Sequence, residues 1–551
     1  MDRQRPDNHT RFALLMWRAT HQWRGKGRLK VSLAILAAVA LQGMTIAMAS
    51  FINIRTAGPQ ALVNATLVAP SGLTTANGGC SGGNAQTNVA LSWSASSAVD
   101  ANGSYLVDNY AALRATAQTG TYASVGTTSG QPPATTLTNV NPTGAAIPQV
   151  FVGNGATTTV HAVNTSSNAG TSVTTGTMGT EPNGLAVTPD GTSVVAAEGA
   201  SSQVQVIAVS TDTVARTVAI PKVGSTVSRP DAVAITPDGL TAYIVDGANN
   251  LVYPMTIATG VLGTGISVGT QGDPSAIVTT PSGGKVYVAN YGAHSVSVIT
   301  TSSNTVTATV TIGAGSSGKP IALALTPNSA HVYVADQGNG QIDDITTSTD
   351  TVTKTITAGS MVDGNVTGGG DPNILAITPD GLRLYDANYT AGTVLDVATA
   401  TDTVSKTIAL ATGQLGNTAA PNAVAMTPNG CQLYVNDYEN NQLDVIALSS
   451  DTVVATSTVG QTGDPFGMSV SPDSAYVYSP NYYDSTVSVV STATNTVSAT
   501  LATAQVGANP YAVLATPTRY WYELQAGHGS WRSSASGPVS MTLGWNQGGW
   551  Q

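Results

Sequence analysis

The most informative shortage in this 551-residue chain is a shortage of charge, because only 9% of its residues are charged and 5% are aromatic. The 20 basic residues are outnumbered by 30 acidic ones, and the formal net charge is -10. An acidic chain repels phosphate backbones, so nucleic-acid binding is not expected. The two cysteines are too few for a disulfide-rich scaffold and cannot by themselves form a structural zinc site.

Helical patterns and catalytic motifs are also missing. Between residues 145 and 517 no segment has apolar residues at helical spacing, whereas strand-favouring Val, Thr and Ile are abundant. There is no HExxH or GxSxG motif, and no histidine is spaced with acids in one repeat. Residues 313–319 have the spacing of a phosphate-binding loop, but Pro320 replaces the Ser or Thr that would bind magnesium. Residues 100–104 alternate oxygen ligands without the bidentate Glu of a calcium loop, so only a weak calcium site stays open there.

The chain contains instead a repeated phrase, which consists of Pro, two or three residues, a small apolar run, and Thr-Pro or Ser-Pro. Successive starts are 44 to 52 residues apart, and each unit contains four short alternating stretches separated by turn residues. This period predicts an all-β propeller with one four-stranded blade per repeat. The starts are Pro182, Pro230, Pro274, Pro320, Pro372, Pro421, Pro465 and Pro510.

The two ends of the repeat region predict how the ring closes. Residues 147–179 resemble a unit without its first strand, and residues 510–517 resemble a first strand with nothing after it. Joined together, they form an eighth blade that removes the two free edges of the ring. We therefore predict an eight-bladed propeller over residues 145–517, with seven blades as the alternative if one unit is degenerate.

The second predicted strand of several units carries a motif that resembles the YVTN family of β-propeller repeats. It stands as YVAN at 287–290, YVAD at 333–336, YDAN at 385–388 and YVND at 434–437. The resemblance implies a propeller of the type found in bacterial and archaeal extracellular or surface-layer proteins. It does not imply a reaction.

The N-terminus predicts export. The first 30 residues contain eight Arg or Lys, and the mostly apolar stretch 31–49 ends in Ala47-Met48-Ala49. A basic region, an apolar core and an A-x-A site form a secretory signal, with cleavage expected after Ala49. If the signal is retained, residues 31–51 are just long enough for a membrane-anchoring helix, which would be the only contact with a membrane. We expect an extracellular or cell-surface location.

Residues 66–144 do not follow the repeat and resemble the front of a fibronectin type III sandwich, with Trp93 on its second strand. The missing last strands recur after the propeller, within 518–545, so we predict one sandwich interrupted by the propeller. Tyr520 is the candidate for its tyrosine corner. A disulfide between Cys80 and Cys431 would join sandwich and propeller, although Cys80 lies in a Gly-rich loop and Cys431 begins a strand.

The best-placed candidate site is the mouth of the propeller channel, where the loops before each first strand and after each second strand emerge together. Asn and Asp are common in these loops simply because they tolerate turns. Alternatively, Tyr, Asn and Asp form a polar, aromatic-lined funnel for sugars or small polar ligands, with acids able to hold calcium. The candidates are Glu181, Asp273, Asp371 and Asp464 before first strands, and Asn290, Tyr291, Asn388, Tyr389, Asp437, Tyr438, Asn481 and Tyr482 after second strands.

Two functions follow from these patterns. The first is an exported, non-catalytic binding or scaffold protein whose propeller face binds an extracellular or cell-envelope protein or polysaccharide, without a cofactor other than possible calcium. The alternative is an extracellular hydrolase, lactonase-like or polysaccharide-acting, with its site at the channel mouth. The absence of a catalytic motif favours the first function, which rests partly on analogy between folds.

Overall fold

The computed structural model describes residues 182–313, 317–358, 374–410, 417–461 and 467–528, together with separate strands and turns on either side. The predicted signal at 1–49, and Cys80, Glu181, Asp371 and Asp464, lie outside the described residues. The chain divides into two compact units, residues 1–66 and 67–551. In the first, β1 (Ser50–Phe51) pairs with β2 (Ala65–Thr66). None of the helices described in either unit has the length and apolar character needed to span a membrane.

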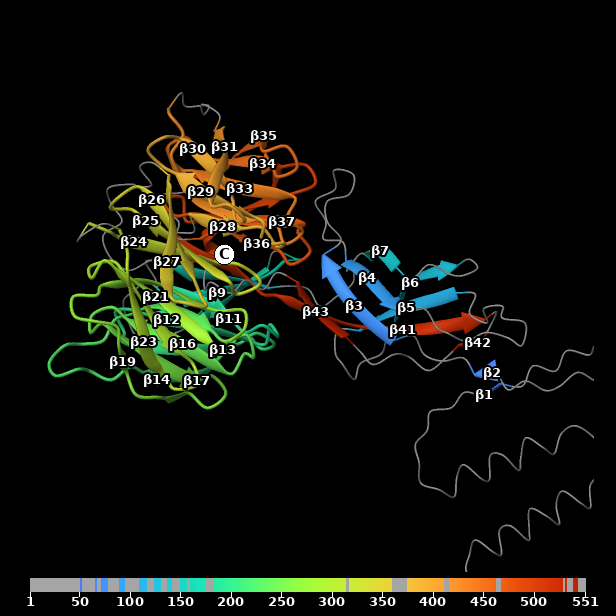
Figure 1. The fold of residues 1–551 in the computed structure, drawn as a ribbon, viewed down its shortest axis with the longest axis horizontal. Helices are drawn as coiled ribbons and strands as arrows, with labels where there is room; N and C mark the ends of the chain where they lie inside the picture. The colour runs from blue at the N-terminus through green and yellow to red at the C-terminus, as the bar shows by residue number, and fades with distance from the viewer. Residues whose placement is uncertain are drawn as a thin grey trace, which may run out of the picture. The chain divides into compact units, whose positions relative to one another are not determined.

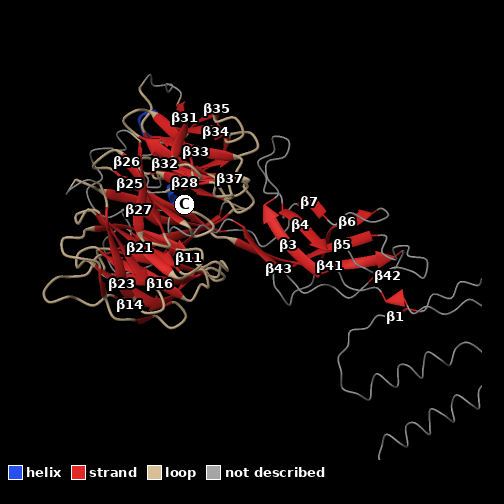
Figure 2. Ribbon diagram, in the orientation of Figure 1, coloured by secondary structure: helices blue, strands red, loops and turns tan. Residues whose placement is uncertain are grey.

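The repeats form eight antiparallel sheets, which we number as blades 1 to 8. The innermost strands of successive blades contact one another, and β11 contacts β40, so the ring is closed (Figure 1). Strands account for nearly all of the regular structure (Figure 2). The structure therefore confirms the predicted all-β fold and the count of eight blades, and it excludes seven.

The blades have the following strands, from the innermost outwards. Blade 1 contains β11 (Pro182–Val187), β12 (Ser193–Glu198), β13 (Gln203–Ala208) and β14 (Thr213–Ala219). Blade 2 contains β15 (Pro230–Ile235), β16 (Thr241–Asp246), β17 (Leu251–Thr256) and an outer edge made by β18 (Val261–Leu262) and β19 (Ile266–Ser267). Blade 3 contains β20 (Pro274–Thr279), β21 (Lys285–Asn290), β22 (Ser295–Thr300) and β23 (Thr305–Thr311). Blade 4 contains β24 (Pro320–Leu325), β25 (His331–Asp336), β26 (Gln341–Thr346) and β27 (Thr351–Thr357).

Blade 5 contains β28 (Leu375–Ile377), β29 (Arg383–Asn388), β30 (Thr393–Ala398) and β31 (Thr403–Ala409). Blade 6 contains β32 (Pro421–Met426), β33 (Gln432–Asp437), the short 3-10 helix η1 (Tyr438–Asn440), β34 (Gln442–Ala447) and β35 (Thr452–Thr458). Blade 7 contains β36 (Ser469–Val470), β37 (Tyr476–Asn481), β38 (Thr486–Ser491) and β39 (Thr496–Leu501), followed by the four-residue helix α3 (Thr503–Val506). Blade 8 contains β40 (Pro510–Ala515), β8 (Gln149–Asn154), β9 (Thr159–Asn164) and β10 (Ala169–Thr174).

Blade 8 joins the two ends of the repeat region. Its inner strand β40 comes from the C-terminal side and pairs antiparallel with β8, with Val513 opposite Val152. Both ends of the region are therefore held by backbone hydrogen bonds, as the truncated first and last repeats predicted.

A tyrosine in the second strand ties each of several blades to the next one. In blades 2 to 6 its hydroxyl donates a hydrogen bond to an Asp or Asn in the turn between the third and fourth strands of the following blade. Tyr287 Oη lies 2.7 Å from Asp350 Oδ1, and Tyr333 Oη lies 2.8 Å from Asp402 Oδ1. The acceptors have positive φ angles, 54° for Asp350 and 51° for Asp402, a conformation that Asp and Asn tolerate better than most residues. The tyrosine of the repeat motif therefore forms a hydrogen bond between neighbouring blades.

Where the tyrosine is absent, its partner changes too. Val195 stands at this position in blade 1, and the facing turn of blade 2 has Gly260, with φ of 72°, in place of Asp or Asn. Phe151 stands there in blade 8, and Asp212 of blade 1 instead accepts a 3.4 Å hydrogen bond from Gln149 Nε2. Where the tyrosine is absent, therefore, either the acceptor is absent as well or another side chain donates to it.

Two further sheets lie outside the repeat region. One has the order β3 (Ser71–Asn77), β4 (Val89–Ser94), β7 (Thr136–Val140). The other has the order β42 (Trp531–Arg532), β41 (Thr518–His528), β5 (Asn109–Ala115), β6 (Ala123–Ser129), with β43 (Val539–Leu543) also paired to β41. Strands that precede and follow the propeller in sequence therefore share one sheet, with Leu524 opposite Ala112. Trp93 is 7% exposed and packs edge-on against Tyr110, with ring centroids 5.4 Å apart. The fibronectin type III assignment itself stays a prediction.

Candidate functional site

The two sets of loops named by the sequence meet at one end of each blade. The residue after the second strand donates its backbone N–H to the carbonyl of the residue before the inner-strand proline. The N···O distance of this bond is 3.0 Å between Gly247 and Arg229, 3.1 Å between Tyr291 and Asp273, and 3.1 Å between Tyr438 and Ala420. The loops around the channel mouth are thus joined to one another by the backbone.

A buried polar residue ends the second strand of every blade. In three blades it is an aspartate whose Oδ1 accepts a backbone N–H from the incoming loop. The bonds are 2.9 Å to Asp246 from Arg229, 2.7 Å to Asp336 from Lys319, and 2.9 Å to Asp437 from Ala420. The full set is Asn154, Glu198, Asp246, Asn290, Asp336, Asn388, Asp437 and Asn481, all 5% exposed or less.

The asparagines of this set also bond inside the fold. Asn290 and Asn481 donate 2.9 Å hydrogen bonds to Ser297 Oγ and Ser488 Oγ, and Asn388 donates one of 2.6 Å to the Ala358 carbonyl. Four predicted ligand-binding residues, Asn290, Asn388, Asp437 and Asn481, therefore have side chains at most 3% exposed and hold the loops in place. These side chains lie inside the fold, and their assignment to ligand binding stays a prediction.

The aromatic candidates lie nearer to solvent. Tyr291, Tyr389, Tyr438 and Tyr482 follow the buried set directly and are partly exposed. Lys319 Nζ lies 5.2 Å from the centroid of the Tyr291 ring, and Tyr482 packs edge-on against Tyr483, which is 58% exposed. The mouth therefore presents aromatic edges and a cation to solvent.

A charged cluster at the mouth includes Arg229 and Asp231, which were not among the candidates predicted from the sequence. Arg229 Nε lies 2.8 Å from Asp231 Oδ2, and Arg229 Nη2 lies 3.7 Å from Asp273 Oδ1. Asp231 is 1% exposed, whereas Arg229 and Asp273 are 44% and 43% exposed. Burial lowers the pKa of Arg229, but the nearby carboxylates, Asp231 first, outweigh it and raise that pKa. The sequence does contain one signal for this cluster. Asp231 follows the inner-strand proline of blade 2, at a position where blades 3 and 4 have Ser275 and Ile321.

Within the described residues no three His, Cys, Asp or Glu side chains come together closely enough to hold a metal ion. Glu181, Asp371 and Asp464 lie outside these residues, so calcium binding through them stays a prediction. Cys431 is disulfide-bonded, and because Cys80 lies outside the described residues their pairing also stays a prediction.

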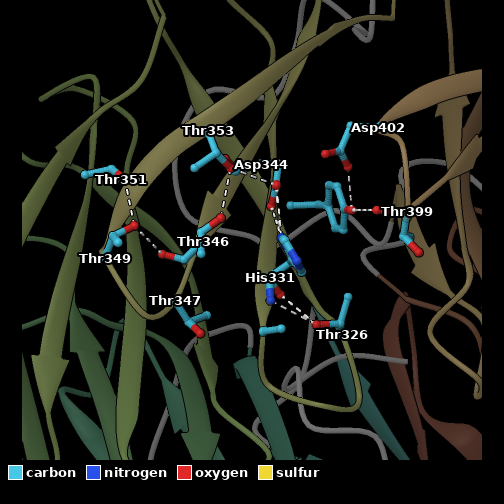
Figure 3. Close-up of polar contacts among 12 residues, drawn as sticks. Thr326, His331, Asp344, Thr346, Thr347, Thr349, Thr351, Thr353, Thr399 and Asp402 are labelled. Carbon is cyan, nitrogen blue, oxygen red and sulfur yellow. Dashed lines mark hydrogen bonds and ion pairs between the residues drawn. The ribbon is translucent and has the colours of Figure 1, made fainter.

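One histidine does contact an acid within a blade, although the spacing of the residues in the sequence does not predict it. His331 Nδ1 lies 2.9 Å from Asp344 Oδ1, across neighbouring strands of blade 4 (Figure 3). Thr353 also donates a 3.1 Å hydrogen bond to Asp344. His331 begins its strand, so this pair lies at the end of the blade opposite the mouth. No hydrogen bond joins His331 to a Ser or Cys side chain in the described chain, and so a nucleophile–base arrangement is not formed there.

Comparison with solved structures finds chains of similar fold. The chain is similar to the dihydro-heme d1 dehydrogenase NirN, with a TM-score of 0.50 and 10% identity over 68% of this chain and 76% of that one. A Kuenenia stuttgartiensis hydrazine synthase matches with a TM-score of 0.44 and 20% identity, over 56% of this chain and 96% of that one. An inactive virginiamycin B lyase from Staphylococcus aureus, in complex with quinupristin, matches with a TM-score of 0.41 and 14% identity, over 54% and 89%.

Comparison with protein-family models and with curated proteins finds no match, so the YVTN assignment is not confirmed. At these identities the similarities concern the fold alone. The chain is an eight-bladed β-propeller protein.

Proposed function

We propose that this chain is an exported, cell-surface or secreted binding and scaffold protein that contacts its partner through the channel mouth of the propeller. The observation that carries the proposal is the half-exposed pair of Arg229 and Asp273, which links the mouths of blades 2 and 3. The charges of this pair face solvent, whereas the buried polar residues that end the second strands form hydrogen bonds inside the fold. The signal predicted from the sequence at residues 1–49 favours export.

The finer assignment rests on resemblance. The YVTN-type motif favours a role at the bacterial cell surface, and the sheets built by β3–β7 and β41–β43 are consistent with a fibronectin type III-like module that displays the propeller. The expected partner is a polysaccharide or protein of the envelope or extracellular space. Alternating charge from Arg229 to Asp273 to Lys319, beside Tyr291, suits a polar ligand that offers both donors and acceptors.

The test is binding of the purified full chain to immobilised extracellular polysaccharides and cell-wall fractions. The double variant Arg229→Ala/Asp273→Ala is expected to bind these fractions more weakly than the wild type. Arg216→Ala is the matched control, because Arg216 is an exposed arginine on the outer strand β14, and it is expected to bind normally. Equal binding by both variants would refute a site at the mouth. Release of soluble sugars, or opening of an added lactone, would favour the alternative hydrolase.

A further inference from the structure

The outer strand of blade 2 is broken, unlike that of blade 3. In blade 3, β23 is a continuous strand of seven residues. In blade 2, β18 pairs with Met255 and Thr256, β19 pairs with Leu251 and Val252, and the residues between them are Gly263-Thr264-Gly265. The break therefore lies opposite the middle of β17, where Gly263 donates a 2.7 Å backbone hydrogen bond to the Pro254 carbonyl.

The break leaves a cavity between blades 2 and 3. In blade 3 the residue opposite Val298 is Ala308, which packs against the core shared with blade 4. The corresponding place opposite Pro254 is occupied by the Gly-Thr-Gly loop, in which two residues have no side chain to fill the space. The resulting cavity has a volume of about 540 Å³, which lies within the range of small-molecule sites.

The lining combines an apolar floor with an uncharged polar rim. Pro254 and Ile266 are buried, Val306 is partly buried, and Thr264, Ser267 and Asn304 at the rim are exposed. Asn304 Oδ1 accepts a 2.7 Å hydrogen bond from Tyr243 Oη, which fixes the orientation of its amide. In the described chain, no protein group bonds to Asn304 Nδ2 or to the hydroxyls of Thr264 and Ser267, so these groups are available to a ligand.

We propose that this groove, which we call the blade 2–3 groove, binds the ring of a neutral sugar. The apolar face of a pyranose would lie on Pro254, Ile266 and Val306, and its hydroxyls would bond to the rim. None of the residues lining the groove is charged, so a charged ligand would be desolvated without a counter-charge. A peptide cannot add along β17, because β18 and β19 occupy its edge on both sides of the break.

The test uses the full chain and a panel of neutral hexoses, N-acetylhexosamines and uronic acids, with binding measured by saturation-transfer NMR and calorimetry. Ser267→Phe fills the groove and is expected to abolish binding of the neutral sugar. Thr264→Val removes one hydroxyl with little change of shape and is expected to weaken binding roughly three- to tenfold. Thr311→Phe is the matched control, because Thr311 is the exposed blade 3 residue at the position of Ser267, and it is expected to bind normally.

Saturable binding of a neutral sugar that Ser267→Phe abolishes and Thr311→Phe retains supports the proposal. The proposal is overturned if no neutral sugar binds saturably, if uronic acids bind as well as neutral sugars, or if the two Phe variants bind alike. Thermal unfolding of each variant shows whether it is folded. If Ser267→Phe does not fold, the weaker binding expected of Thr264→Val tests the proposal instead. Arg229→Ala/Asp273→Ala is expected to bind the sugar normally, which separates this groove from the channel mouth.

Discussion

Replacing Tyr333 by Phe removes one hydroxyl from the contact between blades 4 and 5. The tyrosine is fully buried, and its hydroxyl donates to Asp402 Oδ1 at 2.8 Å. Burial, with a contribution from Asp402, raises the pKa of Tyr333 above its ordinary value, so the hydroxyl keeps its proton at neutral pH. A hydrogen bond to a charged acceptor contributes about 1.5–3 kcal/mol to stability. For a propeller of roughly 370 residues this loss lowers Tm by about 2–4 °C.

The assay is thermal unfolding by calorimetry of the wild type, Tyr333→Phe, Asp402→Gly and the double variant. Glycine suits position 402 because its φ is 51°, and Gly260 stands at the equivalent position in blade 2. If the hydroxyl and the carboxylate stabilise each other, the second substitution lowers the free energy of unfolding only slightly once the first has been made. Tyr476→Phe is the control, because Tyr476 is 37% exposed, and no change is expected. Single effects that add within about 0.5 kcal/mol in the double variant would refute the bond between blades.

Three further predictions concern buried charge, the disulfide and export. Both carboxylate oxygens of Asp386 are buried and have no hydrogen-bond partner among the residues that the structure describes, and burial raises the pKa of Asp386 to about 7. Because the folded state then binds the proton more tightly than the unfolded chain, the stabilisation is full below about pH 4 and is lost as the pH rises to about 7. Asp386→Val, which matches Val288 of blade 3, is expected to raise Tm at pH 8 and to flatten the pH profile of stability, whereas parallel profiles would contradict the argument. Mass mapping of an unreduced digest is expected to find the Cys80 and Cys431 peptides linked, and free thiols at both would contradict the bond. N-terminal sequencing of the exported protein is expected to begin at Ser50, and an intact residue 1 would indicate an anchor.

The blade architecture could be predicted because it depends on local signals. Proline ends each inner strand because it donates no ladder hydrogen bond, and Asp or Asn at positions such as Asp350 takes the positive φ of the outer turn. These signals recur with one period, and the incomplete units at the two ends predicted ring closure. Whether the candidate site binds a ligand stays a prediction. Its loops were placed correctly at the end of the second strands, but the side chains of Asn290 and Asp437 point into the fold, because burial depends on neighbours that a repeat pattern does not name.

The sequence by itself determined the unit: four strands, their turns, the number of units and the way the ring closes. These features depend on backbone preferences and on alternation of side chains over a few residues. Only the tertiary structure decided which tyrosine meets which acid, that Arg229 of blade 2 faces Asp273 of blade 3, and that a two-glycine break opens a groove. Each of these contacts joins different blades, so its energy depends on how the blades pack, and no local pattern in either blade specifies it.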